Sequence, residues 1–558
     1  MRVAPHAWLI LITVPLAACT IEGVALLPGS DEQGDSADEI GDDETGLEEE
    51  GDDPFPDLPP NEPLEPSEFC TLPSAALDGP LPCEMPELAE SVAAEIRWEW
   101  VGPGTETSVL TTPLVANLDD DNGDGFIDVC DTPDVVAAVV DVPATKTAIW
   151  PDAHLYILSG DTGQLTRKIE YGIDGAVNPA IADLDGDGRP EIIALEAVLP
   201  NSPYTITERR LVAFDNQGEL LWQGSHWQAA RGGGALAIAD LDGDGSPEII
   251  APEYVADADG ELLWAVDDPA IAYAMPVAVD LDLDGDLEVV FGTSAYAHDG
   301  THLFDAPLAP PNHGSVAIAN FDSDPYPELY IQHEGAHGII EHDGSLKAPC
   351  PTDGSVNGTG NNPAAIHDLD SDGNAELVFG YHSQLHVLSV ADDTCTARWS
   401  RSVDANDIIA SGTIFDLLDD GEAETIYADR SRVQIVSGDG QLLFQIPRVA
   451  RESIANPVVA DVDGDGAAEI LVASSKPISY SGEPEIPPTT TLTLIDSQVG
   501  AFAPTRRVWN QHTYHYSNIR EDARVPPHEL PHWALENGFR INVGAGMVAS
   551  DTCIPPWF

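Results

Sequence analysis

Residues 178–194 read Asn-Pro-Ala-Ile-Ala-Asp-Leu-Asp-Gly-Asp-Gly-Arg-Pro-Glu-Ile-Ile-Ala, and the recurrence of this phrase decides the fold. An apolar run, an acidic loop with glycines and a second apolar run follow one another within it, and we find the same order along most of the chain. The acid or amide that begins the loop recurs at Asp183, Asp240, Asp280, Asn320, Asp368, Asp416 and Asp461. A divergent copy precedes these at 120–128.

Short strand-like stretches surround each loop. In the second copy they are 179–182, 192–195, 210–214 and 220–222, and they lack the 3.6-residue period of a helix. Four short strands in each period predict an all-β fold made of β-propeller blades, from residue 96 to residue 505. Eight loops favour eight blades, and seven is the alternative if the divergent first copy is not a blade. We expect 96–101 to complete the final blade as a closing strand.

Oxygen-bearing side chains occupy fixed positions in each loop. In 183–191, positions 1, 3, 5 and 9 are carboxylates, position 6 is a glycine that permits a sharp turn, and position 2 is an apolar residue that we expect to point inward. Hard oxygen donors without imidazole or thiolate select calcium over zinc or copper. We therefore expect several structural Ca²⁺ ions. The candidate ligands are Asp120, Asn122, Asp124, Asp128, Asp183, Asp185, Asp187, Glu191, Asp240, Asp242, Asp244, Glu248, Asp280, Asp282, Asp284, Glu288, Asn320, Asp322, Asp324, Glu328, Asp368, Asp370, Asp372, Glu376, Asp416, Asp420, Glu424, Asp461, Asp463, Asp465 and Glu469.

Three copies depart from this pattern. The fifth has Pro325 where glycine is expected, and the seventh has Leu418 at a ligand position, so the occupancy of the seventh loop stays open. The first copy also fits an EF-hand loop with Asp131 at position 12, but strand-like runs flank it where an EF-hand needs helices. We interpret it as an enlarged blade loop.

The loops resemble FG-GAP/VCBS repeats, the calcium-binding repeats of integrin-α-like β-propellers, over roughly residues 97–500. The resemblance implies calcium at the ligand positions named above. The stretch 507–518, continuing to Asn542, is similar to a C-terminal tail of such repeat proteins in myxobacteria and similar bacteria. We expect 506–558 to pack on the propeller.

The N-terminus predicts export. Residues 1–18 combine Arg2 with the apolar run 7–16, which has the length of a signal-peptide core and is too short to span a bilayer. Leu16-Ala17-Ala18-Cys19 resembles the bacterial lipobox, which implies lipidation of Cys19 and cleavage before it. An ordinary signal peptide with an incidental cysteine is the alternative. By resemblance to lipoprotein sorting, Thr20 favours the outer membrane or cell surface.

Charge divides the chain further. The formal net charge is -75, which excludes a nucleic-acid binder that works through a basic surface. Residues 31–65 contain 16 acidic residues, several prolines and no lysine or arginine, so we expect 19–67 to be a disordered linker. A cysteine-containing segment, 68–95, follows it.

Six cysteines remain besides Cys19. They are Cys70, Cys83, Cys130, Cys350, Cys395 and Cys553. An even count in an exported chain suggests up to three disulfides. Cys350 with Cys395 and Cys70 with Cys83 are local candidate pairs, but spacing alone fixes neither.

Catalytic motifs are weak. His333-Glu334-Gly335-Ala336-His337 matches the HExxH zinc motif, which requires a helix, but strand-like residues flank it, so we interpret the match as a coincidence and name no catalytic residue. The predicted function is a non-catalytic, calcium-binding surface propeller for adhesion or for recognition of an unknown protein or glycan. The alternative is a calcium-dependent, lyase-like enzyme acting on polysaccharides, since some polysaccharide lyases use eight-bladed propellers with similar loops.

Overall fold

The computed structural model describes residues 81–82, 87–123, 125–141, 152–198, 206–230, 232–266, 274–351, 362–381, 383–391, 394–404, 411–450, 454–476, 490–544 and 553–554. The chain divides into two compact units, 1–53 and 54–558, and every described residue belongs to the second. Cys19, the signal segment and the acidic linker lie outside the described residues. Among the residues described, no helix is long and apolar enough to cross a membrane.

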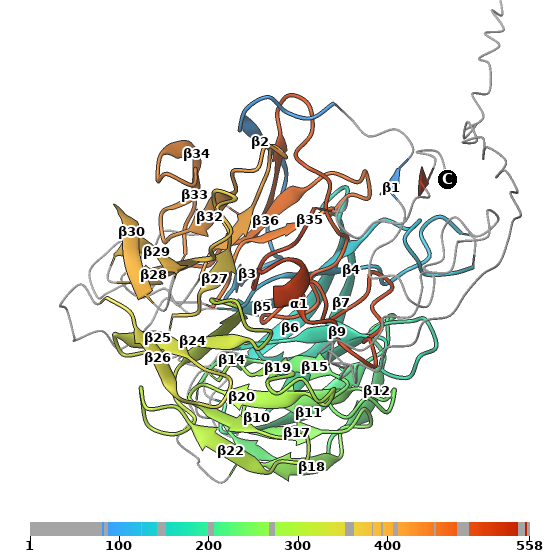
Figure 1. Ribbon diagram of the computed structural model, residues 1–558. Helices are drawn as coiled ribbons and strands as arrows, with labels where there is room; N and C mark the ends of the chain where they lie inside the picture. Colours follow the sequence, from blue (N-terminus) through green and yellow to red (C-terminus); the bar gives the residue numbers. More distant parts are fainter. Residues whose placement is uncertain are drawn as a thin grey trace, which may run out of the picture. The chain divides into compact units, whose positions relative to one another are not determined.

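The described part of the second unit contains six separate four-stranded antiparallel sheets (Figure 1). We name each set of four strands a series, numbered by the order of its acidic loop. Series 3 is β15 (Ala237–Ala239), β16 (Glu248–Ala251), β17 (Tyr254–Ala256) and β18 (Leu262–Ala265); series 4 is β19 (Val277–Val279), β20 (Glu288–Phe291), β21 (Ser294–Tyr296) and β22 (His302–Asp305). Series 5 is β23 (Ser315–Ala319), β24 (Glu328–His333), β25 (Ala336–Ile340) and β26 (Leu346–Pro349); series 6 is β27 (Ala365–His367), β28 (Glu376–Tyr381), β29 (Gln384–Ala391) and β30 (Thr394–Ser402). Series 7 is β31 (Thr413–Phe415), β32 (Glu424–Ala428), β33 (Arg432–Val436) and β34 (Leu442–Pro447); series 8 is β35 (Val458–Ala460), β36 (Glu469–Ala473), β37 (Leu492–Ser497) and β2 (Ala94–Trp100).

A ten-stranded sheet contains two more series, which the single residue pair Glu196–Ile173 joins. Series 1 is β4 (Leu114–Ala116), β5 (Asp134–Asp141), β6 (Asp152–Ser159) and β7 (Leu165–Asp174); series 2 is β9 (Ala180–Ala182), β10 (Glu191–Val198), β11 (Glu208–Phe214) and β12 (Leu220–Gln223). The remaining elements are β1 (Leu81–Pro82), β3 (Glu106–Val109), β8 (Val177–Asn178), β13 (Gln228–Ala229), β14 (Gly234–Ala235), α1 (His532–Leu535) and β38 (Cys553–Ile554). Repeated four-stranded sheets of this kind confirm the predicted all-β propeller fold.

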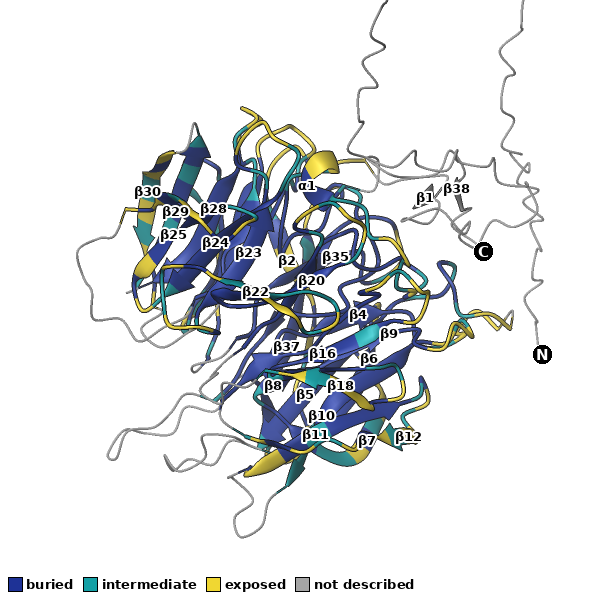
Figure 2. Cartoon of the chain, turned by 60° about the horizontal axis from the view of Figure 1, so that its bottom comes forward, coloured by how far each residue is buried: buried dark blue, intermediate teal, exposed yellow. Residues whose placement is uncertain are grey.

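Burial falls from the first to the fourth strand of a series. In series 3, β15 is wholly buried, whereas three of the four residues of β18 are exposed. Figure 2 shows the same contrast between the dark blue inner strands and the yellow on outer strands such as β30. The apolar residue at position 2 of the loops is buried, as predicted: Leu241 is 1% exposed and Leu369 is 0% exposed. The inner strands and these loop residues therefore form the cores of the blades.

The closing strand is confirmed. β2 pairs antiparallel with β37, so residues from the start of the propeller complete its last sheet. In Figure 1 the blue β2 lies beside the orange strands of series 8. Trp98 of β2 then reaches series 1, where its indole Nε1 donates to Gly160 O at 2.7 Å and its ring lies against Gly163. The first and last series are thus joined through both backbone and side chains.

The same aromatic contact recurs between other neighbours. Trp264 of series 3 packs on Gly300 and donates to His298 O at 2.8 Å, both in series 4. Trp399 of series 6 packs on Gly440 of series 7. Gly300 and Gly440 have positive φ, and a side chain there would meet the aromatic ring. An aromatic residue of the fourth strand thus fixes one series against the next.

The C-terminal segment 506–544 lies along the first strands of most series. Trp509 exchanges backbone hydrogen bonds with Val115 of β4, and Phe539 does so with Ile366 of β27. Arg540 Nη1 donates to the carbonyls of Val316 (3.0 Å) and Ala364 (2.8 Å). Further contacts join Asn510 to Ile181, Gln511 to Ile238 and Asn542 to Val459. Because these strands belong to different series, the segment ties the inner edges of the propeller together.

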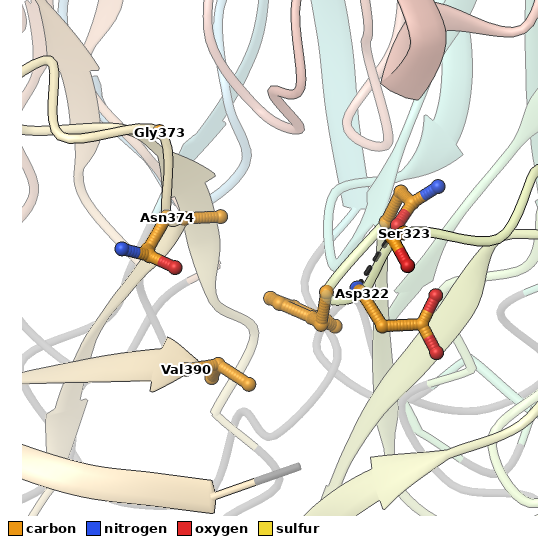
Figure 3. A pocket seen from close by; sticks show the side chains of 8 residues that line it. Asp322, Ser323, Gly373, Asn374 and Val390 are labelled. Atoms are coloured by element: carbon orange, nitrogen blue, oxygen red, sulfur yellow. Dashed lines mark hydrogen bonds between the residues drawn. The ribbon is translucent and has the colours of Figure 1, made fainter. Parts of the chain in front are cut away.

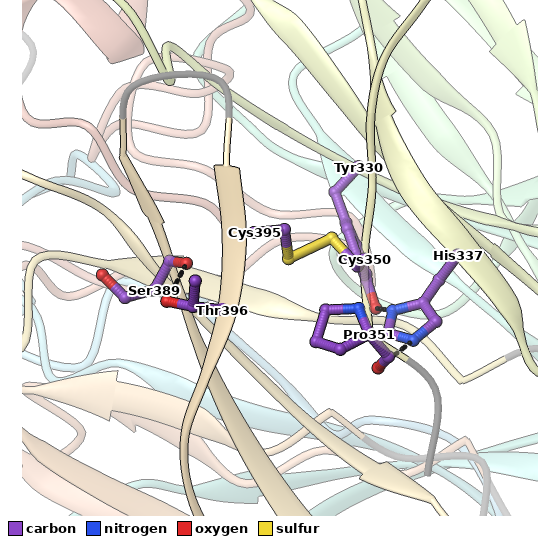
Figure 4. The surroundings of a disulfide bond; sticks show 7 residues. All are labelled: Tyr330, His337, Cys350, Pro351, Ser389, Cys395 and Thr396. Carbon is purple, nitrogen blue, oxygen red and sulfur yellow. Dashed lines mark hydrogen bonds between the residues drawn. A yellow bond between two sulfur atoms is a disulfide. The ribbon is translucent and has the colours of Figure 1, made fainter. Parts of the chain in front are cut away.

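The predicted disulfide between Cys350 and Cys395 is confirmed, and it joins series 5 to series 6 (Figure 4). Beside it, Tyr330 OH and His337 Nδ1 lie 3.0 Å apart, and His337 Nε2 lies 3.1 Å from Pro351 O. Cys130 is disulfide-bonded as well. Cys70 and Cys83 lie outside the described residues.

Candidate metal centre

The acidic loops connect the first and second strands of each series and share one conformation. In loop 2, the Asp183 carboxylate accepts the N–H of Asp187 (3.1 Å) and of Gly188 (2.9 Å), and Glu191 Oε2 accepts the N–H of Leu184 (2.8 Å). Loops 3, 4, 6 and 7 repeat all three bonds at the equivalent residues. The carboxylate at position 1 therefore holds the turn, and the glutamate at position 9 ties it to the second strand.

This conformation brings carboxylate oxygens together. In loop 2, Asp183, Asp185 and Glu191 each offer one oxygen, and all three oxygens lie within 4.8 Å of one another. The same holds for Asp240, Asp242 and Glu248, for Asp280, Asp282 and Glu288, and for Asp368, Asp370 and Glu376. Oxygen donors at this spacing suit a hard divalent cation such as Ca²⁺. The predicted ligands at positions 1, 3 and 9 thus converge in these four loops.

Burial and neighbouring carboxylates make the charged form of the glutamate at position 9 unfavourable. Burial raises the pKa of Glu191 to about 8, and the charges of Asp185 and Asp183 add to the effect. The pKa of Glu288 is also raised to about 8, and that of Glu248 to about 7, for the same reasons. In loop 8, Glu469 is fully buried beside Asp461, Asp463 and Asp465, and its Oε1 has no hydrogen-bond partner. A positive charge beside these carboxylates, from a metal ion or from a basic side chain, would offset the crowded negative charge.

These raised pKa values predict a pH-dependent stability in the presence of a chelator. A glutamate with a raised pKa holds its proton in the folded state, so its contribution is present at low pH and is lost as pH rises through the folded value. Burial lowers the pKa values of His512 and His532. These histidines therefore make stability rise with pH, but only below about pH 6.5, where the unfolded chain would protonate them. We therefore expect thermal melts in EDTA to show falling stability between about pH 6.5 and about pH 8. Calcium should abolish this slope; a midpoint in EDTA that rises over the same window would contradict the prediction.

The first loop holds two sets of oxygen-bearing side chains, one after the other. Only one of the two sets is among the ligands predicted from the sequence. Asp120 accepts the N–H of Gly123 (2.7 Å) and of Gly125 (2.9 Å), which supports it as a first position. Asp128 is buried and its N–H donates to Asp131 Oδ2 at 3.0 Å. Asn122 N–H donates to Asp131 Oδ1 at 3.3 Å, and Asp124 lies outside the described residues.

The strand register places a second group around Asp134. Asp134 pairs with Ala116 at the start of β5, where the other loops have their position-9 glutamate, and it accepts the N–H of Leu118 at 3.2 Å. Burial raises the pKa of Asp134 to about 8, with a further contribution from Asp119. Asn117, Asp119 and Asp134 thus correspond to positions 1, 3 and 9. The signal that could have found them is the end of the apolar run at Ala116, because every other loop begins directly after such a run.

Basic side chains pair with loops 2, 5, 6 and 8. In loop 2, Arg524 Nε lies 3.2 Å from Asp183 Oδ2, and in loop 6, Arg398 Nη1 lies 2.9 Å from Glu376 Oε1. In loop 5, Lys347 Nζ lies 2.7 Å from Glu328 and also pairs with Asp322. In loop 8, Arg507 Nε lies 3.3 Å from Asp461, and Arg97 pairs with Asp463.

The predicted ligands at position 5 stabilise the turn of their own loop. Each accepts the N–H of the residue two positions later. These ligands are Asp187, Asp244, Asp284, Asp324, Asp372, Asp420 and Asp465.

The HExxH match lies in a β-hairpin. His333 ends β24, Ala336 begins β25, and the two residues pair across a two-residue turn. Glu334 and Gly335 have positive φ, as such a turn requires. Gln332, not His333, pairs with His337, so the two histidines do not share the helical face that the zinc motif needs.

Two pockets lie near series 5 and 6. The first, of about 380 Å³, opens between loops 5 and 6, with Asp322 and Ser323 on one side and Gly373 and Asn374 on the other (Figure 3). The second, of about 260 Å³, is lined by aromatic and imidazole side chains. These are His337, Phe379, Tyr381, His386 and Trp399. None of the described residues that line the second pocket is Asp, Glu, Lys or Arg.

No protein-family profile and no curated protein matches this sequence. Among solved structures, the V. cholerae biofilm matrix protein Bap1 is similar, with a TM-score of 0.63 and 19% identity over 83% of this chain and 100% of that chain. The exotype rhamnogalacturonan lyase YesX has a TM-score of 0.48 at 14% identity, over 85% of this chain and 83% of that one. The Bacillus licheniformis rhamnogalacturonan lyase PL11 has a TM-score of 0.49 at 15% identity, over 82% and 84%. The likeness to Bap1 shows a shared fold.

Proposed function

We propose that this chain is a calcium-stabilised propeller of eight blades, related to FG-GAP/VCBS repeats, that is anchored outside the cell through Cys19 and recognises a protein or glycan without catalysing a reaction. The shared loop conformation carries the proposal: the same hydrogen bonds bring carboxylates to one point in blade after blade. Eight four-stranded series support eight blades rather than seven. The formal charge of -75 argues against a nucleic-acid partner.

A location outside the cell rests on two further observations. The similar V. cholerae structure is that of a biofilm matrix protein, and the disulfide between Cys350 and Cys395 suits an oxidising compartment. Extracellular calcium modules bind with dissociation constants of about 10⁻⁴ to 10⁻³ M, so the ions would serve structure and not signalling.

Binding without catalysis is supported by the second pocket. Trp399, Tyr381 and Phe379 offer aromatic surface, and none of the described lining residues is Asp, Glu, Lys or Arg. A screen of the purified protein against surface glycans, with and without calcium, tests the proposal. We expect binding that depends on calcium and no change in the glycan. Release of shortened glycan would contradict it.

The second candidate is a lyase-like enzyme that acts on polysaccharides. The imidazoles of His337 and His386 and the phenol of Tyr381 line one pocket and could move a proton. Incubation with uronate-containing polysaccharides should then yield unsaturated products with new ultraviolet absorbance. Loss of this absorbance in His386→Ala, with unchanged thermal stability, would favour the enzyme over the binding module.

The anchor gives a separate prediction. Cys19→Ser removes the thiol that would carry the lipid, and two or three acyl chains hold a protein on a membrane more firmly than one. We expect the variant to move from the membrane fraction to the soluble fraction, whereas Thr20→Ser should stay in the membrane fraction. Fractionation followed by immunoblotting measures both. Retention of Cys19→Ser in the membrane fraction would refute lipid anchoring.

A further inference from the structure

The third and fourth strands of every series pair with a bulge at the same step. In each pairing, one residue of the fourth strand is passed over, so that the residues on either side of it pair with consecutive residues of the third strand. The skipped residues are Thr166, Leu221, Leu263, Leu303, Lys347, Arg398, Leu443 and Arg97, in series 1 to 8. We call this the bulge position.

Leucine at the bulge position is exposed. Leu263 and Leu303 are 51% and 47% exposed, and Leu221 and Leu443 are comparable. An exposed leucine gains little from burial, so packing does not explain its presence in four series. A leucine at the bulge position adds no charge to the acidic loop of its series.

Lysine or arginine at the bulge position pairs with the acidic loop of its own series. Lys347 Nζ lies 2.7 Å from Glu328 Oε1 and 3.0 Å from Glu341 Oε1, and it also pairs with Asp322. Only 5% of the Lys347 side chain is exposed. The amine therefore sits among three carboxylates.

Series 6 and 8 use arginine in the same way. Arg398 pairs with Asp370, and its Nη1 lies 2.9 Å from Glu376 Oε1. Arg97 pairs with Asp463 of loop 8 and lies 2.8 Å from Asp161. Asp370 and Glu376 are two of the three residues whose oxygens converge in loop 6. The guanidinium thus competes for the oxygens that a divalent ion would bind.

We propose that the residue at the bulge position decides whether the acidic loop of its series takes a divalent cation. Leucine leaves the carboxylates of loops 3 and 4 to the ion; in loop 2, the half-exposed Arg524 of the C-terminal segment also contacts Asp183. Lysine or arginine at the bulge position instead neutralises the loop with a cation of the chain itself. This rests on the proposed calcium function of the loops. The physical basis is competition: an ion can enter loops 5 and 6 only by displacing a basic side chain from the same carboxylates.

Loop 5 carries a second change that agrees with this inference. Its first position is Asn320, whose Nδ2 donates to Asp324 O at 2.6 Å, so a hydrogen-bond donor faces the loop where loop 2 has a carboxylate. The C-terminal segment holds the same loop, because Asn537 pairs with the Asn320 backbone and Trp533 Nε1 donates to Pro325 O at 3.1 Å. A loop clamped by Lys347 has thus also lost its first anionic ligand.

The test counts calcium ions per chain by equilibrium dialysis and metal analysis, in two opposite variants of the full chain. Arg398→Leu frees a loop with a complete set of ligands and should gain about one Ca²⁺. Leu303→Lys introduces a cation at an exposed position of series 4 and should lose about one. Arg401→Leu is the matched control, because Arg401 lies on the same strand as Arg398 but pairs with Gln434, and its count should not change.

The outcomes separate this inference from the proposed function. Counts that move in opposite directions in the two variants, with an unchanged control, support the bulge position as the determinant. A wild-type chain that binds calcium while Arg398→Leu and Leu303→Lys both keep the wild-type count overturns it. A wild-type chain that binds no calcium at millimolar concentration instead overturns the proposed function of the loops.

Discussion

Removal of calcium with EDTA is expected to lower the melting temperature by roughly 5 °C or more. An ion at ten times its dissociation constant stabilises the folded state by about 1.4 kcal/mol, so three or more ions contribute several kcal/mol. Relief of the repulsion between neighbouring carboxylates is part of this binding energy: it amounts to about 1 kcal/mol per pair in water and to more where Glu191 and Glu288 are buried. Scanning calorimetry with and without chelator measures the effect.

Magnesium provides the matched control for this experiment. It demands a tighter octahedral shell and gives up water reluctantly, so equal concentrations of Mg²⁺ should restore less stability than Ca²⁺. A melting temperature that does not change on chelation would contradict structural calcium. Equal recovery with either ion would indicate general screening of charge.

Substitution of Trp509 by alanine is expected to have the second large effect. Trp509 is 0% exposed, stacks on Tyr514 with 4.6 Å between ring centroids, and exchanges backbone hydrogen bonds with Val115 of β4. Truncation of a buried tryptophan costs about 3–5 kcal/mol through lost contacts and the cavity it leaves. We expect Trp509→Ala to lower the free energy of unfolding by this amount even in saturating calcium, as measured by denaturant unfolding.

Trp227→Ala is the control for this substitution. Trp227 is 41% exposed, and its main partner is Arg210, whose guanidinium lies 4.5 Å from the ring centroid. Its removal should cost about 1 kcal/mol or less. Similar losses for the two variants would contradict the role assigned to residues 506–544 in joining the inner strands.

The fold could be predicted because the repeats carry it. Each acidic loop marks the junction between two strands, so the position of Asp240 or Asp280 also fixes the ends of the strands on either side. The closing strand was predicted within two residues, since apolar and charged residues alternate from Ile96 to Trp100 before the first blade. Loop ligands follow from the same spacing, because positions 1, 3 and 9 are set by the local backbone.

Contacts between distant segments, other than the closing strand and the Cys350–Cys395 pair, could not be predicted. Lys347 and Arg398 lie 19 to 28 residues after the loop carboxylates they pair with, and only the bulge in the strand register brings them to the loops. The path of residues 506–544 depends on inner strands from across the propeller. In the first loop, the conspicuous run after Asp120 concealed Asp134, whose role depends on its pairing with Ala116.

The most direct test of bound calcium is a crystal structure from calcium-containing solution, with anomalous scattering from a lanthanide soaked in its place. We expect anomalous peaks among Asp240, Asp242 and Glu248 and among Asp280, Asp282 and Glu288, with no peak beside Lys347. Ordered loops without a peak at either of the first two positions would contradict it.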